Sequence, residues 1–176
     1  MFHLIQQWML QAGLWGVAGF FIGGFIEEIA LPLPSPVIFV GAKIFFVRPL
    51  SFVVLLKIFL LVILPLALGA LLASLLVYGV CFKWGRKAVD YLSKWTRVTW
   101  TDVEAVRAKL SQGRSEEWTL FITRSIPFAP TKVFNIAAGI LRMNTVRFTL
   151  IVLVANVIKF SILFFSISIL GVTTIF

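Results

Sequence analysis

Two adjacent carboxylates, Glu27 and Glu28, stand in the stretch FIEEIALPLPSPVIFVGA, which carries no other charge. A carboxylate in apolar surroundings pairs with a cation or exchanges a proton, because an isolated charge is costly there. Proline interrupts a helix, since it lacks the backbone donor and its ring collides with the preceding turn. Paired charge beside interrupted helix predicts a site for ions or protons. The expected breaks in this segment are Pro32, Pro34 and Pro36.

A second segment of the same kind is FITRSIPFAPTKVFNIAAGILRMNTVRF, over residues 121–148. Arg124 is the charge ahead of its prolines, and its breaks follow at Pro127 and Pro130. A shift of 96 positions superimposes the two segments and places Pro34 on Pro130. Interrupted hydrophobic segments at corresponding positions of two halves are typical of transporters built from inverted repeats.

The charges of both segments predict one substrate-binding or proton-coupling site. We expect Glu27 and Arg124 to be counter-ions, because they hold corresponding places in the two halves. Adjacent helical residues point about 100° apart, so one of the two glutamates should face the cavity, and Glu27 is preferred. Helix N-termini after the prolines would add positive dipole ends, which suit an anion such as a phosphate headgroup. The expected site residues are Glu27, Glu28, Arg124, Lys132 and Asn135.

The composition indicates an integral membrane protein. Of 176 residues, 60% are hydrophobic and 13% are charged, whereas soluble domains carry about 25% charged residues. The run over 58–82 is uncharged and exceeds the roughly 20 residues that a spanning helix needs. The net charge of +9 is attributed to cytoplasmic loops and to anionic lipid rather than to nucleic acid.

Cys81 and His3 are the single cysteine and the single histidine. One cysteine excludes an internal disulfide, and two such residues cannot form a zinc site. We therefore expect no metal and no cofactor. The sequence also lacks the His/Asp constellation that phosphoryl transfer on lipids would need, so we expect no enzyme.

The predicted fold class is all-α, a single multi-pass membrane domain with about three to five membrane helices and two re-entrant helical hairpins arranged as an inverted repeat. Helices are expected over 4–26 and 50–82, with a kink near Pro65 and Gly69. The re-entrant segments are expected over 27–48 and 118–142. Irregular backbone cannot face lipid, and their apolar arms are too short to cross the bilayer alone.

Residues 83–117 form the one water-facing or interface-lying part of the chain. They hold eight of the sixteen Lys and Arg residues and five of the seven acids. Thr101 and Glu104 resemble a capping box at the start of a helix. The positive-inside rule places this amphipathic loop in the cytoplasm.

The two segments resemble those of the DedA family, the VTT-domain or SNARE-associated Golgi-protein-like membrane proteins. The first match is Glu27 followed by Pro32-Leu33-Pro34-Ser35, and the resemblance spans roughly residues 15–165. It implies two facing re-entrant hairpins, and several members are linked to moving phospholipids or polyprenyl phosphate carriers between leaflets, some with proton coupling. The second match comprises Arg124, Pro127, Pro130, Asn135, Ala138 and Gly139.

The favoured function is a flippase or scramblase for phosphate-bearing lipid. The alternatives are a proton-coupled transporter for a small solute or ion, and a membrane assembly factor that transports nothing. The expected partners are membrane lipids with anionic or phosphate headgroups. The involvement of protons and homo-oligomerisation stay open. The expected location is the cell membrane, in bacteria the inner membrane.

Overall fold

The computed structural model describes residues 14–30, 52–96, 98–112, 116–127 and 131–173. Most of these residues are helical, with no strand among them, so the predicted all-α class is confirmed. Among them, two helices are long and apolar enough to cross a bilayer, over 52–84 and 145–166. The expected total of three to five membrane helices stays a prediction.

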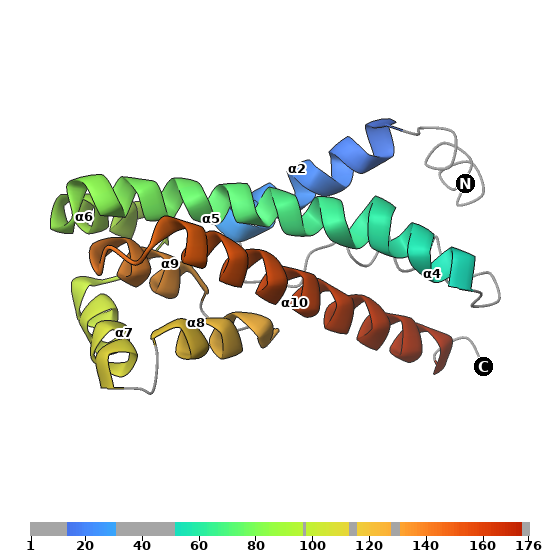
Figure 1. Ribbon diagram of the computed structural model, residues 1–176. Helices are drawn as coiled ribbons and strands as arrows, with labels where there is room; N and C mark the ends of the chain where they lie inside the picture. The colour runs from blue at the N-terminus through green and yellow to red at the C-terminus, as the bar shows by residue number, and fades with distance from the viewer. Residues whose placement is uncertain (1–13, 31–51, 97, 113–115, 128–130, 174–176) are drawn as a thin grey trace.

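The first long helix consists of α4 (Phe52–Ile58), the π-helical turn η1 (Phe59–Ile63) and α5 (Leu64–Trp84), which follow one another without a break (Figure 1). Pro65 lies in the first turn of α5, immediately after the π-helical turn. Proline cannot donate the backbone hydrogen bond of a regular helix, and a local π-helical turn is one way to absorb that loss. A kink was expected near Pro65 and Gly69. The structure has a π-helical turn before Pro65, and the kink itself stays a prediction.

Helix α2 (Leu14–Ala30) packs directly on α5 through one glycine from each helix. A side chain at Gly24 would collide with the backbone carbonyl of Leu66, and a side chain at Gly69 would collide with that of Phe21. Gly69 thus serves close packing of two helices. The backbones can approach only because both positions lack a Cβ atom.

The first predicted re-entrant segment, residues 27–48, begins differently from the expectation. Helix α2 continues to Ala30, so Glu27 and Glu28 lie on its last turns and not in a broken segment. The remaining positions of this segment, including Pro32, Pro34 and Pro36, lie outside the described residues.

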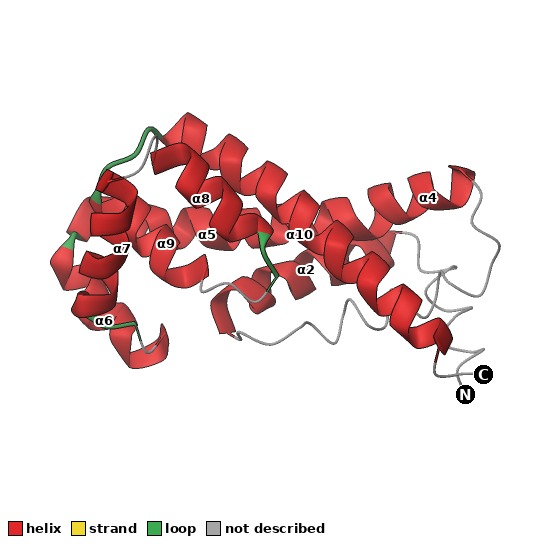
Figure 2. Cartoon of the chain, turned by 90° about the horizontal axis from the view of Figure 1, so that it is seen from below, coloured by secondary structure: helices red, strands yellow, loops and turns green. Residues whose placement is uncertain are grey.

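Two shorter helices follow α5 at one end of the molecule, α6 (Arg86–Thr96) and α7 (Trp100–Gln112) (Figures 1 and 2). Gly85 separates α5 from α6 with a φ of 54°, a conformation that favours glycine. The capping box of α7 lies two residues earlier than predicted. The Thr99 amide donates to the Asp102 carboxylate over 2.9 Å, and the Asp102 amide donates to the Thr99 hydroxyl over 3.4 Å.

The second predicted re-entrant segment, residues 118–142, holds most of α8 (Glu116–Ser125) and all of α9 (Thr131–Ile140), two helices of ten residues each. Each is about 15 Å long at 1.5 Å per residue. Pro127 lies in the turn after α8, and Pro130 lies outside the described residues. In both views α8 runs from the α7 end toward the middle of the molecule, and α9 runs back (Figures 1 and 2).

Helix α10 (Thr145–Thr173) follows a tight turn after α9. The Met143 amide donates to the Ala138 carbonyl, and Arg142 has a φ of 53°, which together form a Schellman-type helix end. Asn144 then caps α10, since its side-chain oxygen accepts hydrogen bonds from the backbone amides of Val146 and Arg147. The Tyr78 hydroxyl donates to the Met143 carbonyl and so ties this turn to α5.

Helices α2 and α8 start at opposite ends of the molecule, and their last turns carry the charges, Glu27 and Glu28 on α2 and Arg124 on α8. Helix α2 begins at the end where α4 lies and stops about halfway along α5, whereas α8 begins at the α6–α7 end and stops at the same level (Figure 1). Each helix packs against the long helix of its own half, α2 on α5 and α8 on α10.

A polar layer separates two apolar cores at this level. One core lies toward α6 and α7 and includes Tyr78, Phe134 and Phe148. The other lies toward α4 and includes Val62 and Phe164. The buried polar residues between them are Glu28, Ser74, Arg124, Asn135, Asn156 and Lys159.

Candidate functional site: a buried ion cluster

The centre of the polar layer is an ion pair between Arg124 on α8 and Glu28 on α2. Their Nη2 and Oε1 atoms are 3.1 Å apart, and their side chains are 0% and 2% exposed. Removing two charges from water costs several kcal/mol per ion, and only close pairing with further hydrogen bonds offsets that cost. The surroundings supply those hydrogen bonds.

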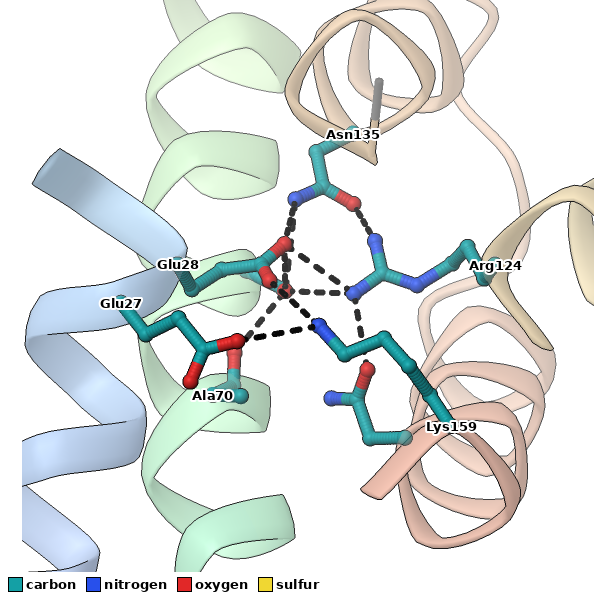
Figure 3. Close-up of polar contacts among 8 residues, drawn as sticks. Glu27, Glu28, Ala70, Arg124, Asn135 and Lys159 are labelled. Atoms are coloured by element: carbon teal, nitrogen blue, oxygen red, sulfur yellow. Dashed lines mark hydrogen bonds and ion pairs between the residues drawn. The ribbon is translucent and has the colours of Figure 1, made fainter. Parts of the chain in front are cut away.

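The carboxylate oxygen Oε1 of Glu28 collects donors from three other helices. The Asn135 amide on α9 donates over 2.9 Å, and the Ser74 hydroxyl on α5 lies 3.1 Å away. The single Ser74 proton can serve either this oxygen or the carbonyl of Ala70, which is 2.9 Å away. Figure 3 shows these groups converging from α2, α5, α8 and α9.

The Arg124 guanidinium is held equally closely. Its Nη1 donates to the Asn135 side-chain oxygen. Its Nη2 shares two protons among three acceptors, the Ser74 hydroxyl at 3.0 Å, the Glu28 carboxylate at 3.1 Å and the Asn156 oxygen at 3.3 Å. These partners fix the planar fork of the guanidinium in one position. Arg124 therefore joins α8 to α2, α5, α9 and α10.

Lys159 on α10 provides the second cation. Its ammonium nitrogen is 3.8 Å from Oε1 of Glu27 and 3.9 Å from Oε2 of Glu28. Two carboxylates and two cations thus share one cluster, and their formal charges cancel when all four are ionised. Electroneutrality makes burial of four charges tolerable in an apolar interior.

Two donors of the cluster have no hydrogen-bond partner within the described part of the chain. They are the buried Nε of Arg124 and the buried Nδ2 of Asn156. Leaving a buried donor without a partner costs about 1–3 kcal/mol. Each of these two N–H groups could therefore gain stability by donating a hydrogen bond to a further acceptor.

The described part of the chain contains no group of three or more His, Cys, Asp or Glu side chains that could hold a metal ion. The groups of the cluster come from both halves of the chain, and Asn156 and Lys159 share a face of α10 because they are three residues apart.

Comparison with known proteins identifies the family of this chain. The model of the VTT domain matches residues 32–169, which is most of the chain. The chain belongs to the VTT domain family. This is the domain of the DedA and SNARE-associated Golgi proteins, so the resemblance inferred from the two segments is confirmed. Neither the curated proteins nor the solved structures gave a match.

Membership of the VTT domain family and the two long apolar helices together indicate a membrane protein. The family match covers the second segment completely and begins just after Glu28 in the first. The ion cluster therefore combines residues within the matched region with two acids that precede it.

The structure brings three of the five predicted site residues into direct contact, namely Glu28, Arg124 and Asn135. The counter-ion of Arg124 is Glu28, so the prediction of a Glu27–Arg124 pair is wrong. Glu27 lies beside them and pairs with Lys159. Because α2 continues as a helix through both glutamates, their side chains point about 100° apart, so Glu27 cannot face the same partner as Glu28.

Lys132 stands apart from these contacts. It is the second residue of α9, half-buried, and it interacts electrostatically with Glu28 without a close ion pair to a described acid.

Ser74, Asn156 and Lys159 were not among the expected site residues. Asn156 joins α10 to α8 through Arg124, and the side chain of Lys159 is buried. A signal was present, because two polar residues three positions apart in an apolar helix share one face.

Proposed function

We propose that this VTT-domain protein is a transporter that moves phosphate-bearing lipid, a phospholipid or a polyprenyl phosphate carrier, between leaflets as a flippase or scramblase. The family is a membrane family often linked to transport. The observation that carries the proposal is the buried ion cluster at which α2 and α8 end (Figure 3). Ionisable residues at membrane depth commonly mark substrate or ion pathways.

The depth of the cluster supports this reading. Ser74 lies ten residues before the end of α5 at Trp84, and Asn156 lies eleven residues after the start of α10 at Thr145. The cluster is therefore about 15 Å from that end of both helices. Half of a hydrocarbon core of about 30 Å is the same distance, so the charges would sit near the midplane.

The proposed layout is an inverted repeat in the cell membrane. Helices α8 and α9 would form a re-entrant hairpin, since two helices of about 15 Å can reach the midplane and return but cannot cross. Helix α2 would begin the corresponding first hairpin from the other side. The loop of residues 83–117, with α6 and α7, would face the cytoplasm because of its basic residues.

The proposed mechanism exposes the cluster alternately to each leaflet and includes no chemical step on the lipid. In its closed state the cluster is neutral, so an anionic headgroup binds only when an ion pair opens. Protonation of a carboxylate would free its cation for the headgroup, which makes protons the natural coupling ion. Inverted repeats provide two related conformations for such a cycle.

The test is reconstitution of the purified protein into liposomes with fluorescently labelled phospholipid. We expect leaflet exchange with the wild-type protein and its loss in Glu28→Gln. Exchange that persists unchanged in this variant would overturn the mechanism. Uptake of small solutes without lipid movement would favour the second transporter class, and neither activity would favour a membrane assembly factor.

A further inference from the structure

The two cations of the cluster are held in different ways. Arg124 has hydrogen-bond or ion-pair partners on four other helices and a fully buried side chain. Lys159 has two carboxylates at 3.8 and 3.9 Å, beyond hydrogen-bond distance, and the Phe160 ring with its centroid 4.6 Å away. No hydrogen bond from the Lys159 ammonium to another described residue accompanies them.

The two cations also differ in position. The side chains of Lys159 and Glu27 are 8% and 10% exposed, compared with 0% and 2% for Arg124 and Glu28. Figure 3 shows the Lys159 ammonium joined by dashed lines to both carboxylates, on the side of the cluster away from Asn135. The Lys159–Glu27 pair therefore forms the outer margin of the cluster.

We infer that Lys159 is the residue that exchanges its carboxylates for the phosphate of an anionic lipid, while Arg124 stays bound and holds the helices together. This inference rests on the proposed function and assigns the headgroup contact to α10. The ligand class is a phosphate monoester or diester on a lipid.

The chemistry of the two side chains agrees with this division. Lysine binds phosphate as a compact point charge on a flexible stem, and it can follow a moving ligand. Freeing Arg124 would break several short contacts at once and leave Glu28 buried without its cation, which is strongly destabilising. Freeing Lys159 separates two long ion pairs at the partly exposed margin.

Charge balance links Glu27 to this step. When Lys159 turns to a phosphate, the Glu27 carboxylate loses its ion pair with that ammonium. Glu27 therefore competes with the lipid phosphate for Lys159. Removing the charge of Glu27 should strengthen headgroup binding, whereas removing the charge of Lys159 should abolish it.

The experiment measures binding of short-chain phosphatidic acid to the purified full-length protein, with the uncharged lipid diacylglycerol in parallel. We expect Lys159→Gln to weaken phosphatidic acid binding by about tenfold or more, as for loss of a charged contact, and to leave diacylglycerol binding unchanged. Lys159→Arg should retain binding, and Glu27→Gln should tighten it. The matched control is Lys57→Gln, an exposed lysine in the apolar helix α4.

A double variant guards against loss of folding. Glu27→Gln with Lys159→Gln removes both charges together, so no new unpaired charge is buried. We expect it to keep the thermal stability of the wild type within a few degrees and to lose selective binding of phosphatidic acid.

The outcomes separate the two proposals. Wild-type binding and lipid movement that Lys159→Gln retains would overturn the role of Lys159 alone. Equal weakening for both lipids would assign Lys159 a purely structural role and would also overturn it. A wild-type protein that neither binds nor moves phosphatidic acid would overturn the proposed function together with this inference.

Discussion

Glu28 and Arg124 lie 96 residues apart in the sequence and form an ion pair of 3.1 Å in the structure. The same shift superimposes the two proline-containing segments, so the two charges hold equivalent places in the two halves of the chain. A carboxylate at one position and a guanidinium at the other neutralise each other where α2 and α8 meet. The helices that carry them are joined by this contact.

The Glu28–Arg124 pair should show strong coupling in a double-mutant cycle. Arg124→Gln leaves a buried carboxylate without its cation, and we expect it to cost about 3–5 kcal/mol, as breaking a buried pair does. The double variant Glu28→Gln/Arg124→Gln should recover much of this loss, because it buries no net charge. Thermal unfolding in detergent measures both. Losses that simply add would show that the pair is not coupled.

Two glycines should be intolerant of any side chain while two others should not. Gly24→Ala and Gly69→Ala would drive a methyl group into the facing backbone, and we expect each to destabilise by about 1–3 kcal/mol, as overpacking does. The controls are Gly19→Ala in α2 and Gly79→Ala in α5, where the added group meets nothing within 4 Å. Both controls should be neutral or stabilising, because alanine favours helix. Equal melting temperatures for all four variants would refute the close approach of α2 and α5.

The start of α7 should loosen in acid. Hydrogen bonds from the Thr99 hydroxyl and backbone amide lower the pKa of Asp102 from its ordinary value of 3.8. A lowered pKa in the folded state means that the cap is fully stabilising above pH 3.8 and is lost as the pH falls through the lowered value. Hydrogen exchange of the amides in the first turn, corrected for intrinsic rates, should rise in this range.

The variant Asp102→Asn is the control for that measurement. It keeps a side-chain oxygen as acceptor but cannot titrate, so its exchange should not change over the same pH range. Persistent acid sensitivity in this variant would assign the effect to another group.

The choice between Glu27 and Glu28 shows where sequence reasoning stopped. Periodicity and the proline segments predicted helices, buried charge and the family correctly. They placed the end of the first helix before Glu27, although α2 continues to Ala30. Gly24 lies four residues before Glu28, so both share the face that packs against α5. Two signals marked Glu28 as the carboxylate that turns inward. The shift of 96 positions places Glu28 and not Glu27 on Arg124, and Gly24 on the same face allows close packing.

Ser74, Asn156 and Lys159 could not be assigned from their own helices. Each is a polar residue in an apolar helix, and its role depends on which helix packs beside it. The packing of α5 and α10 against α8 and α9 is a tertiary relationship between residues as many as 61 positions apart. The sequence pattern of one helix shows that a polar residue is present, but it does not show which residue of another helix will contact it.

The proposed re-entrant hairpin predicts which sites an impermeant thiol reagent reaches from each side of the membrane. Trp118 near the start of α8 and Val146 near the start of α10 are both exposed. Along the chain, Trp118 stands at the entry to the α8–α9 pair and Val146 just after its exit. If this pair enters and returns, Trp118→Cys and Val146→Cys should react from the same side. Tyr91→Cys in α6 should react from that side too, and Phe52→Cys at the start of α4 from the opposite side.

The native Cys81 is buried and should remain unlabelled in intact membranes, so single variants can be compared directly with the wild type. Labelling of whole cells before and after permeabilisation reports the side of each residue. Reaction of Trp118→Cys and Val146→Cys from opposite sides would mean that the chain between them crosses the bilayer. The midplane position of Arg124 would then need another explanation, because two ten-residue helices would have to span the whole hydrocarbon core.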